Sequence, residues 1–206
     1  MFVISNNCCG GMVYRLCKVP FNNPFTWAVC PYRGIKHIMA HLYDINWANI
    51  VLTKSNLRKH TYVITVDNAF PIHYVHYKFN RKFHEQTVIT HGSNQDDDWS
   101  SDTVSDHIWE YVVEKYIERT RRMMKVNELP CFLLHEDTFD NTEYNVTLKD
   151  LAYHESPFKR IIITTDTTIQ RNDDICKTII TATRNYPKPS VREYFADIKS
   201  FFSLPD

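Results

Sequence analysis

Two adjacent cysteines, Cys8 and Cys9, stand in the stretch ISNNCCGG, residues 4 to 11. The apolar residues 2 to 4 before them are typical of a strand, and apolar residues from Met12 onward recur at helical spacing. The cysteines are therefore predicted at a strand-to-helix turn, where the free N–H groups of the helix favour a thiolate. Either thiol is a candidate nucleophile.

Acyl chemistry through a thiolate also needs a base and a group that orients the base. His76 is the predicted base, with His73 as the alternative, because a histidine can take and return a proton near neutral pH. Asp67 could hold the imidazole in one tautomer. These three residues lie about sixty positions from the cysteines, so only the fold could bring the two groups together.

Donors for the oxyanion are available beside the thiols. The side-chain amides of Asn6 and Asn7 could donate, together with the backbone N–H of Cys9 or Gly10. A glycine at this turn permits a positive φ or a close backbone approach. The same residues also fit a buried, inert cysteine beside a simple Asn-Gly turn.

A metal site is not expected, although the chain has ten histidines. His73 and His76 are three residues apart in an alternating stretch, and such residues point to opposite faces of a strand. The acidic run at residues 96–98 lacks the alternating ligand positions of a calcium loop. Phosphate-loop and dinucleotide-binding fingerprints are missing, so we expect no cofactor.

An arginine cluster offers a second kind of chemistry. Arg119, Arg121 and Arg122 lie in a segment whose apolar stripe predicts a helix through residue 124, with Glu118 and Arg122 as an i,i+4 ion pair. Guanidinium groups could clamp a phosphate or carboxylate, and the alternative is a solvated helix face. We assign Arg121 and Arg122 to substrate binding.

Strands alternate with helices along the chain. Residues 60–66 and 71–79 are typical of strands and predict a hairpin or a short connection between neighbouring strands. The apolar runs beginning at 131 and 160 are typical of buried parallel strands. Between those runs, Thr147 and Asp150 form a predicted capping box. This order predicts an α/β fold, a single three-layer domain with a mostly parallel central sheet and helices on both faces.

The whole chain, residues 1–206, is expected to form that one domain, since its 43% apolar content is enough for one core. Residues 91–106 are predicted to be a surface loop and residues 190–203 a C-terminal helix. The zero net charge argues against nucleic acid, and no apolar run approaches the ~18 residues of a membrane span. Six irregularly spaced cysteines favour reduced thiols and a cytoplasmic location. No feature indicates an oligomeric state.

Five motifs resemble two related groups of mostly bacterial proteins. They are, in order, VISNNCCGG, VPFNNPFTW, IHYVHYKF, KYIERTRRM and FLLHED. One group is labelled exopolysaccharide biosynthesis proteins, and the other is labelled papain-like cysteine peptidases. The resemblance covers about the first 165 residues. Two positions depart from the groups' pattern: Cys9 replaces a large aromatic residue, and Thr26 replaces an acidic one.

The resemblance implies acyl transfer or hydrolysis through Cys8, which matches the early cysteine of both groups, with a glycan or polysaccharide precursor as a substrate. His76 matches the histidine of the HY motif, and Arg121 or Arg122 matches the basic helix. Trp27 of the PFTW motif joins Asn6, Gly10 and His73 as an expected substrate contact. The alternative function is a non-catalytic module that binds a sugar phosphate or nucleotide sugar at the same turn.

Overall fold

The computed structural model describes the following residues: 1–7, 9–26, 28–45, 51–55, 61–66, 70–74, 77–79, 89–91, 114, 117–136, 145–182 and 191–205. For residues 28–29 and for the strands between 51 and 91, the description covers the backbone.

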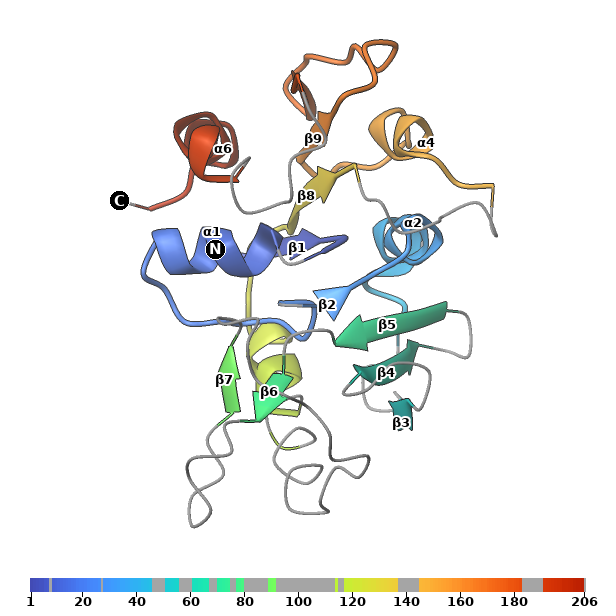
Figure 1. The fold of residues 1–206 in the computed structure, drawn as a ribbon, viewed down its shortest axis with the longest axis vertical. Helices are drawn as coiled ribbons and strands as arrows, with labels where there is room; N and C mark the ends of the chain where they lie inside the picture. Colours follow the sequence, from blue (N-terminus) through green and yellow to red (C-terminus); the bar gives the residue numbers. More distant parts are fainter. Residues whose placement is uncertain are drawn as a thin grey trace.

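A four-stranded parallel sheet forms the centre of the fold (Figure 1). Its strands, in spatial order, are β1 (Val3–Ser5), β8 (Cys131–His135), β9 (Arg160–Thr164) and β10 (Cys176–Ile180). All three neighbouring pairs are parallel. The predicted parallel strands at 131 and 160 are confirmed, and their buried apolar runs explain why they lie inside the sheet.

Side chains alternate between the two faces of this sheet and form two hydrophobic clusters. Phe132 and Leu134 pack on the side of α2 (Tyr32–His41) and α4 (Leu148–Ala152). Leu133 packs on the side of α1 (Cys9–Leu16) and α6 (Phe195–Phe202). Figure 1 shows the two helix pairs on opposite sides of the sheet. The predicted three-layer α/β architecture is confirmed.

A second, antiparallel sheet was not part of the predicted fold. Its strands, in spatial order, are β2 (Ala28–Val29), β5 (Phe70–Tyr74), β4 (Thr61–Val66) and β3 (Val51–Ser55). The predicted hairpin of β4 and β5 is present. The single strand predicted over residues 71–79 is wrong, because β6 (Tyr77–Phe79) pairs separately with β7 (Ile89–His91).

Local helix signals agree with the structure where it describes them. Thr147 and Asp150 form the predicted capping box at the start of α4. The helical residues 117–123 carry the predicted ion pair between Glu118 and Arg122. Helix α6 lies within the predicted range 190–203, while the predicted loop at 91–106 lies outside the described residues except for His91. Within the described ranges, no helix combines the length and hydrophobicity that crossing a lipid bilayer requires.

Candidate functional site

Polar residues gather where the parallel strands end. Ser5 closes β1 and leads into Asn6 and Asn7, while His135 closes β8 and leads into Glu136. In open α/β sheets, ligands bind outside the carboxyl ends of the strands. This carboxyl edge, defined by residues 5–7, 135–136 and 164–166, is the candidate functional site.

The turn from β1 into α1 is held by side-chain contacts to the backbone. Asn7 Oδ1 accepts a hydrogen bond of 3.0 Å from the N–H of Cys9, the first residue of α1. Ser5 Oγ accepts one of 2.9 Å from the N–H of Gly10 and donates one of 2.5 Å to the carbonyl oxygen of Asn7. The predicted strand-to-helix turn is confirmed, and these bonds fix its backbone.

Gly10 allows the helix to approach the strand closely. A Cβ atom at this position would lie 2.7 Å from Ser5 Oγ and 3.3 Å from Ser5 Cβ. Because Gly10 lies inside α1, close approach rather than a positive φ explains the glycine. Its described role is therefore to set the geometry of the turn, and the predicted substrate contact stays a prediction.

The hydrogen bonds of the turn also redefine which groups could hold an oxyanion. The N–H groups of Cys9 and Gly10, both considered as donors, already bind Asn7 Oδ1 and Ser5 Oγ. Asn7 uses its oxygen in the same contact, so its Nδ2 is the side-chain donor that this geometry offers. Oxyanion stabilisation at this turn would thus rely on the Asn7 amide more than on the helix N-terminus.

Asn6 joins two strands that are 129 residues apart in the sequence. Its Nδ2 donates to the carbonyl oxygen of His135 at 2.9 Å, and its Oδ1 accepts from the N–H of His135 at 2.8 Å. The backbone oxygen of Asn6 also accepts from the N–H of Cys30 at 2.8 Å. With its side chain 1% exposed, Asn6 continues the β1–β8 pairing beyond the strands. The structure thus describes a positioning residue, and substrate binding by Asn6 stays a prediction.

His135 is an imidazole at the carboxyl edge that the sequence reasoning did not assign. Its Nδ1 lies 2.6 Å from the carbonyl oxygen of Glu136, and a carbonyl can only accept, so Nδ1 carries the proton. In a neutral ring Nε2 then holds the lone pair that a base needs. By strand alternation His135 shares the face of Leu133, which is the side of α1. The stretch FLLHED could have indicated His135 from the sequence, because its polar residues directly follow a buried strand.

Glu136 connects the ends of β8 and β9. Its Oε2 accepts from Thr164 Oγ1 at 2.9 Å, and from the N–H and Oγ1 of Thr165 at 2.6 and 2.7 Å. Three donors on one oxygen stabilise the charged carboxylate and hold it at the edge. Glu136 therefore fixes the relative positions of two strand ends beside the candidate site.

The arginine cluster packs against the loop at residues 21–26. Arg119 is buried, its Nη1 lies 3.5 Å from the carbonyl oxygen of Thr26, and its guanidinium lies 5.4 Å from the ring centre of Phe21. Arg122 donates to the carbonyl oxygen of Phe21 at 3.0 Å and pairs with Glu118. Arg121 is exposed. Of the two arginines assigned to substrate binding, Arg122 thus holds a loop, whereas Arg121 faces solvent.

The structure describes only some of the other predicted site residues. His73 lies in β5, where its backbone is opposite Val29 of β2 and Val63 of β4. The structure brings Asn6, Asn7 and Gly10 together at the β1–α1 turn. Four assigned residues lie outside the described ranges: Cys8, Trp27, Asp67 and His76.

The five described cysteines are free thiols, and most are chemically quiet. Burial raises the pKa of Cys17 and Cys30, and it raises the pKa of Cys131 to about 11. Burial also raises the pKa of Cys176, and Cys9 is 0% exposed. A raised pKa keeps the thiols of Cys17, Cys30, Cys131 and Cys176 protonated at neutral pH, where a thiol is a poor nucleophile.

Among the described residues, no three His, Cys, Asp or Glu side chains are arranged to hold a metal ion. No protein-family model matches the chain, and no curated protein is similar to it. The resemblance to the polysaccharide and papain-like groups therefore stays a prediction.

Proposed function

We propose that this protein is a thiol-dependent acyl transferase or hydrolase that uses Cys8 as its nucleophile. The observation that carries the proposal is the β1–α1 turn. Asn7 and Cys9, the sequence neighbours of Cys8, are fixed by a 3.0 Å hydrogen bond at the carboxyl edge of a parallel sheet. A nucleophile between a strand and a helix is a recurrent catalytic arrangement.

The environments of the other cysteines support the choice of position 8. Burial raises the pKa of Cys17, Cys30, Cys131 and Cys176. Cys9 lies in the first turn of α1 with its side chain inside the core cluster of that face. Burial thus keeps four of these thiols protonated and makes Cys9 inaccessible, so Cys8 is the cysteine left for covalent chemistry.

In the proposed reaction, the imidazole base takes the proton of the Cys8 thiol and becomes an imidazolium. The Cys8 sulfur attacks an ester, thioester or amide carbonyl, and a carbon–sulfur bond forms. The Asn7 Nδ2 donates to the oxyanion. The bond to the leaving group then breaks, and that group takes a proton from an imidazolium. Water or an acceptor hydroxyl attacks the resulting thioester and releases the thiol. The resemblance suggests glycan or polysaccharide precursors as substrates.

Two histidines compete for the role of base. His76 is the choice that the HY motif supports. His135 is supported by its place at the carboxyl edge and by the Nδ1 contact, which fixes the tautomer of its ring. The variants His76→Gln and His135→Gln distinguish the two histidines. Only the variant that lacks the base should lose the rise of kcat/KM with pH near neutrality.

Activity against a panel of aryl esters and acyl-coenzyme A thioesters tests the proposal. Cys8→Ala should lower kcat/KM at least about 1,000-fold without changing the circular dichroism spectrum, since a nucleophile cannot be replaced by binding alone. Cys9→Ala is the matched control and should keep most of the activity. Equal losses in the two variants, or full activity in Cys8→Ala, would remove the covalent mechanism.

The alternative is a non-catalytic module that binds a sugar phosphate or nucleotide sugar. It is favoured by one observation: the N–H groups of Cys9 and Gly10 are already engaged, so two of the expected oxyanion donors are occupied. In this case Cys8→Ser should leave binding unchanged and Arg121→Ala should weaken it. Thermal shift measures both, because a ligand at 100 times its Kd adds about 2.7 kcal/mol of stability.

A further inference from the structure

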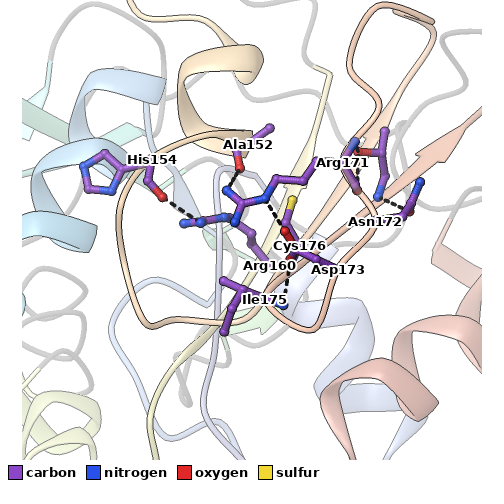
Figure 2. A network of polar contacts seen from close by, with 9 residues as sticks. Ala152, His154, Arg160, Arg171, Asn172, Asp173, Ile175 and Cys176 are labelled. Atoms are coloured by element: carbon purple, nitrogen blue, oxygen red, sulfur yellow. Dashed lines mark hydrogen bonds and ion pairs between the residues drawn. The ribbon is translucent and has the colours of Figure 1, made fainter.

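A buried arginine lies at the opposite, amino-terminal edge of the parallel sheet. Arg160 is the first residue of β9, and its side chain is 0% exposed. It is the largest of the fully buried side chains among the described residues. Figure 2 shows Arg160 surrounded by the end of α4, the β9–β10 connection and the start of β10. Such burial is rare for arginine and normally requires a partner of opposite charge.

The Arg160 guanidinium has few partners of its own. Its Nη2 donates to the carbonyl oxygen of His154 at 2.7 Å. Within the described part of the chain, its Nε and Nη1 are fully buried and make no hydrogen bond of normal geometry, although the Cys176 thiol is close enough to interact with the guanidinium. The sheet register places Cys176 opposite Arg160, so a thiol rather than a carboxylate is the neighbouring side chain on β10.

The nearby carboxylate serves a different arginine. Asp173 Oδ2 accepts from Arg171 Nε at 2.6 Å, and Asp173 Oδ1 accepts from the N–H groups of Ile175 and Cys176 at 2.8 and 2.7 Å. Arg171 also donates through Nη1 to the carbonyl oxygen of Ala152 at 2.8 Å. Figure 2 shows these contacts beside Arg160. Among the described residues of this cluster, two guanidinium groups thus stand beside one carboxylate, which leaves one positive charge uncompensated.

That charge cannot be removed by loss of a proton. An arginine stays protonated in proteins, whereas a buried lysine would release its proton. A buried charge without a partner is strongly destabilising. A trapped water could accept one of the two hydrogen bonds but would leave the charge in place. A single negative charge would satisfy a free donor and neutralise the cluster.

We propose that Arg160 binds one small monovalent anion of the halide class, which accepts a hydrogen bond from its unpartnered N–H groups beside Cys176. One negative charge balances the cluster. The enclosed position of Arg160 favours a small ion over an organic anion or a phosphate ester, because a larger ligand would have to displace the segments that cover the arginine. The anion is a structural part of the amino edge and is independent of the thiol chemistry at the carboxyl edge.

The test is the thermal unfolding midpoint of the full chain as chloride replaces gluconate at constant ionic strength. The midpoint of the wild type should rise with chloride and then saturate, as expected for one site on the native state. Arg160→Met should lose this chloride-specific rise. Arg192→Met, which removes an exposed arginine, is the matched control and should keep it.

A second measurement covers the case in which Arg160→Met does not fold. Crystals of the wild type grown in bromide should show an anomalous scattering peak beside the Arg160 guanidinium. Absence of that peak, or an equal chloride response in Arg160→Met and wild type, would overturn the proposal and leave ordered water as the occupant. Because both readouts are independent of activity, this result cannot be confused with failure of the thiol mechanism.

Discussion

The two edges of the parallel sheet hold their polar groups in opposite ways. At the carboxyl edge, Asn6 bonds both atoms of its amide to the backbone of His135, and Glu136 accepts three hydrogen bonds on one oxygen. At the amino edge, Arg160 keeps two buried donors without a partner among the described residues. The first edge is organised by its own residues, whereas the second has buried donors that the described residues do not satisfy.

Buried polar groups therefore have two different roles at the two edges of the sheet. Hydrogen bonds that are complete within the chain fix a backbone, and at the carboxyl edge they fix the turn beside Cys8 before any substrate arrives. A buried charge without a counterion instead marks a place where an ion can stabilise the fold. Mutations at the two edges should therefore have unequal costs.

The largest loss of stability is expected for Asn6→Ala. It removes two buried hydrogen bonds between the Asn6 amide and the backbone of His135, which should lower the free energy of unfolding by about 3 kcal/mol. Urea denaturation measures this loss. Asn172→Ala, at an exposed asparagine that accepts one bond from the N–H of Thr178, is the control and should cost less than about 1 kcal/mol. Similar costs would mean that the Asn6 bridge does not hold the edge together.

Gly10→Ala should have the next largest effect. The added Cβ would lie 2.7 Å from Ser5 Oγ, and this overlap should cost about 2 kcal/mol. In a Ser5→Ala background the hydroxyl is gone, so the same substitution should cost less than in the wild type. A double-mutant cycle by urea denaturation measures the difference. Additive costs would show that the close approach of α1 to β1 is not what requires the glycine.

A smaller effect, confined to acid, is expected at the amino edge. The Arg171 contact and the N–H groups of Cys176 and Ile175 lower the pKa of Asp173 to about 2. Because the folded pKa lies below the unfolded value, this stabilisation is complete above about pH 4 and is lost as the pH falls toward 2. Asp173→Asn should flatten that part of the curve of thermal midpoint against pH. An unchanged acid limb would show that the carboxylate does not contribute.

The smallest effect is expected for Arg160→Met without chloride. Replacing a buried, unneutralised charge by an apolar side chain of similar length removes its desolvation cost along with one hydrogen bond. The free energy of unfolding should stay within about 1 kcal/mol of the wild type in gluconate. A loss as large as that of Asn6→Ala would show that Arg160 is already fully compensated.

Much of the central fold could be predicted, because its signals are local. The apolar runs of β8 and β9 indicate buried parallel strands, and Thr147 with Asp150 indicates the start of α4. The division of residues 71–79 between β5 and β6 could not be predicted. Alternation along a strand reports which face is buried, but not where the pairing partner changes.

The sites were harder to predict because their contacts are long-range. Asn6 meets His135 across 129 residues, which no local pattern reveals. His135 could have been noticed, since it ends a buried strand in FLLHED. Arg160 could not, because an arginine beside an apolar run is usually exposed. Its burial depends on β10, whose pairing with β9 was not predicted.

The central claim is that Cys8 is the reactive thiol at the carboxyl edge. Its most direct test is the rate at which iodoacetamide labels each cysteine of the native protein at neutral pH, followed by mass spectrometry. Cys8 should be labelled at least about tenfold faster than any of the other five cysteines, because an accessible thiolate reacts faster than a buried thiol. Labelling of Cys8 at the slow rate of the buried cysteines would contradict the account.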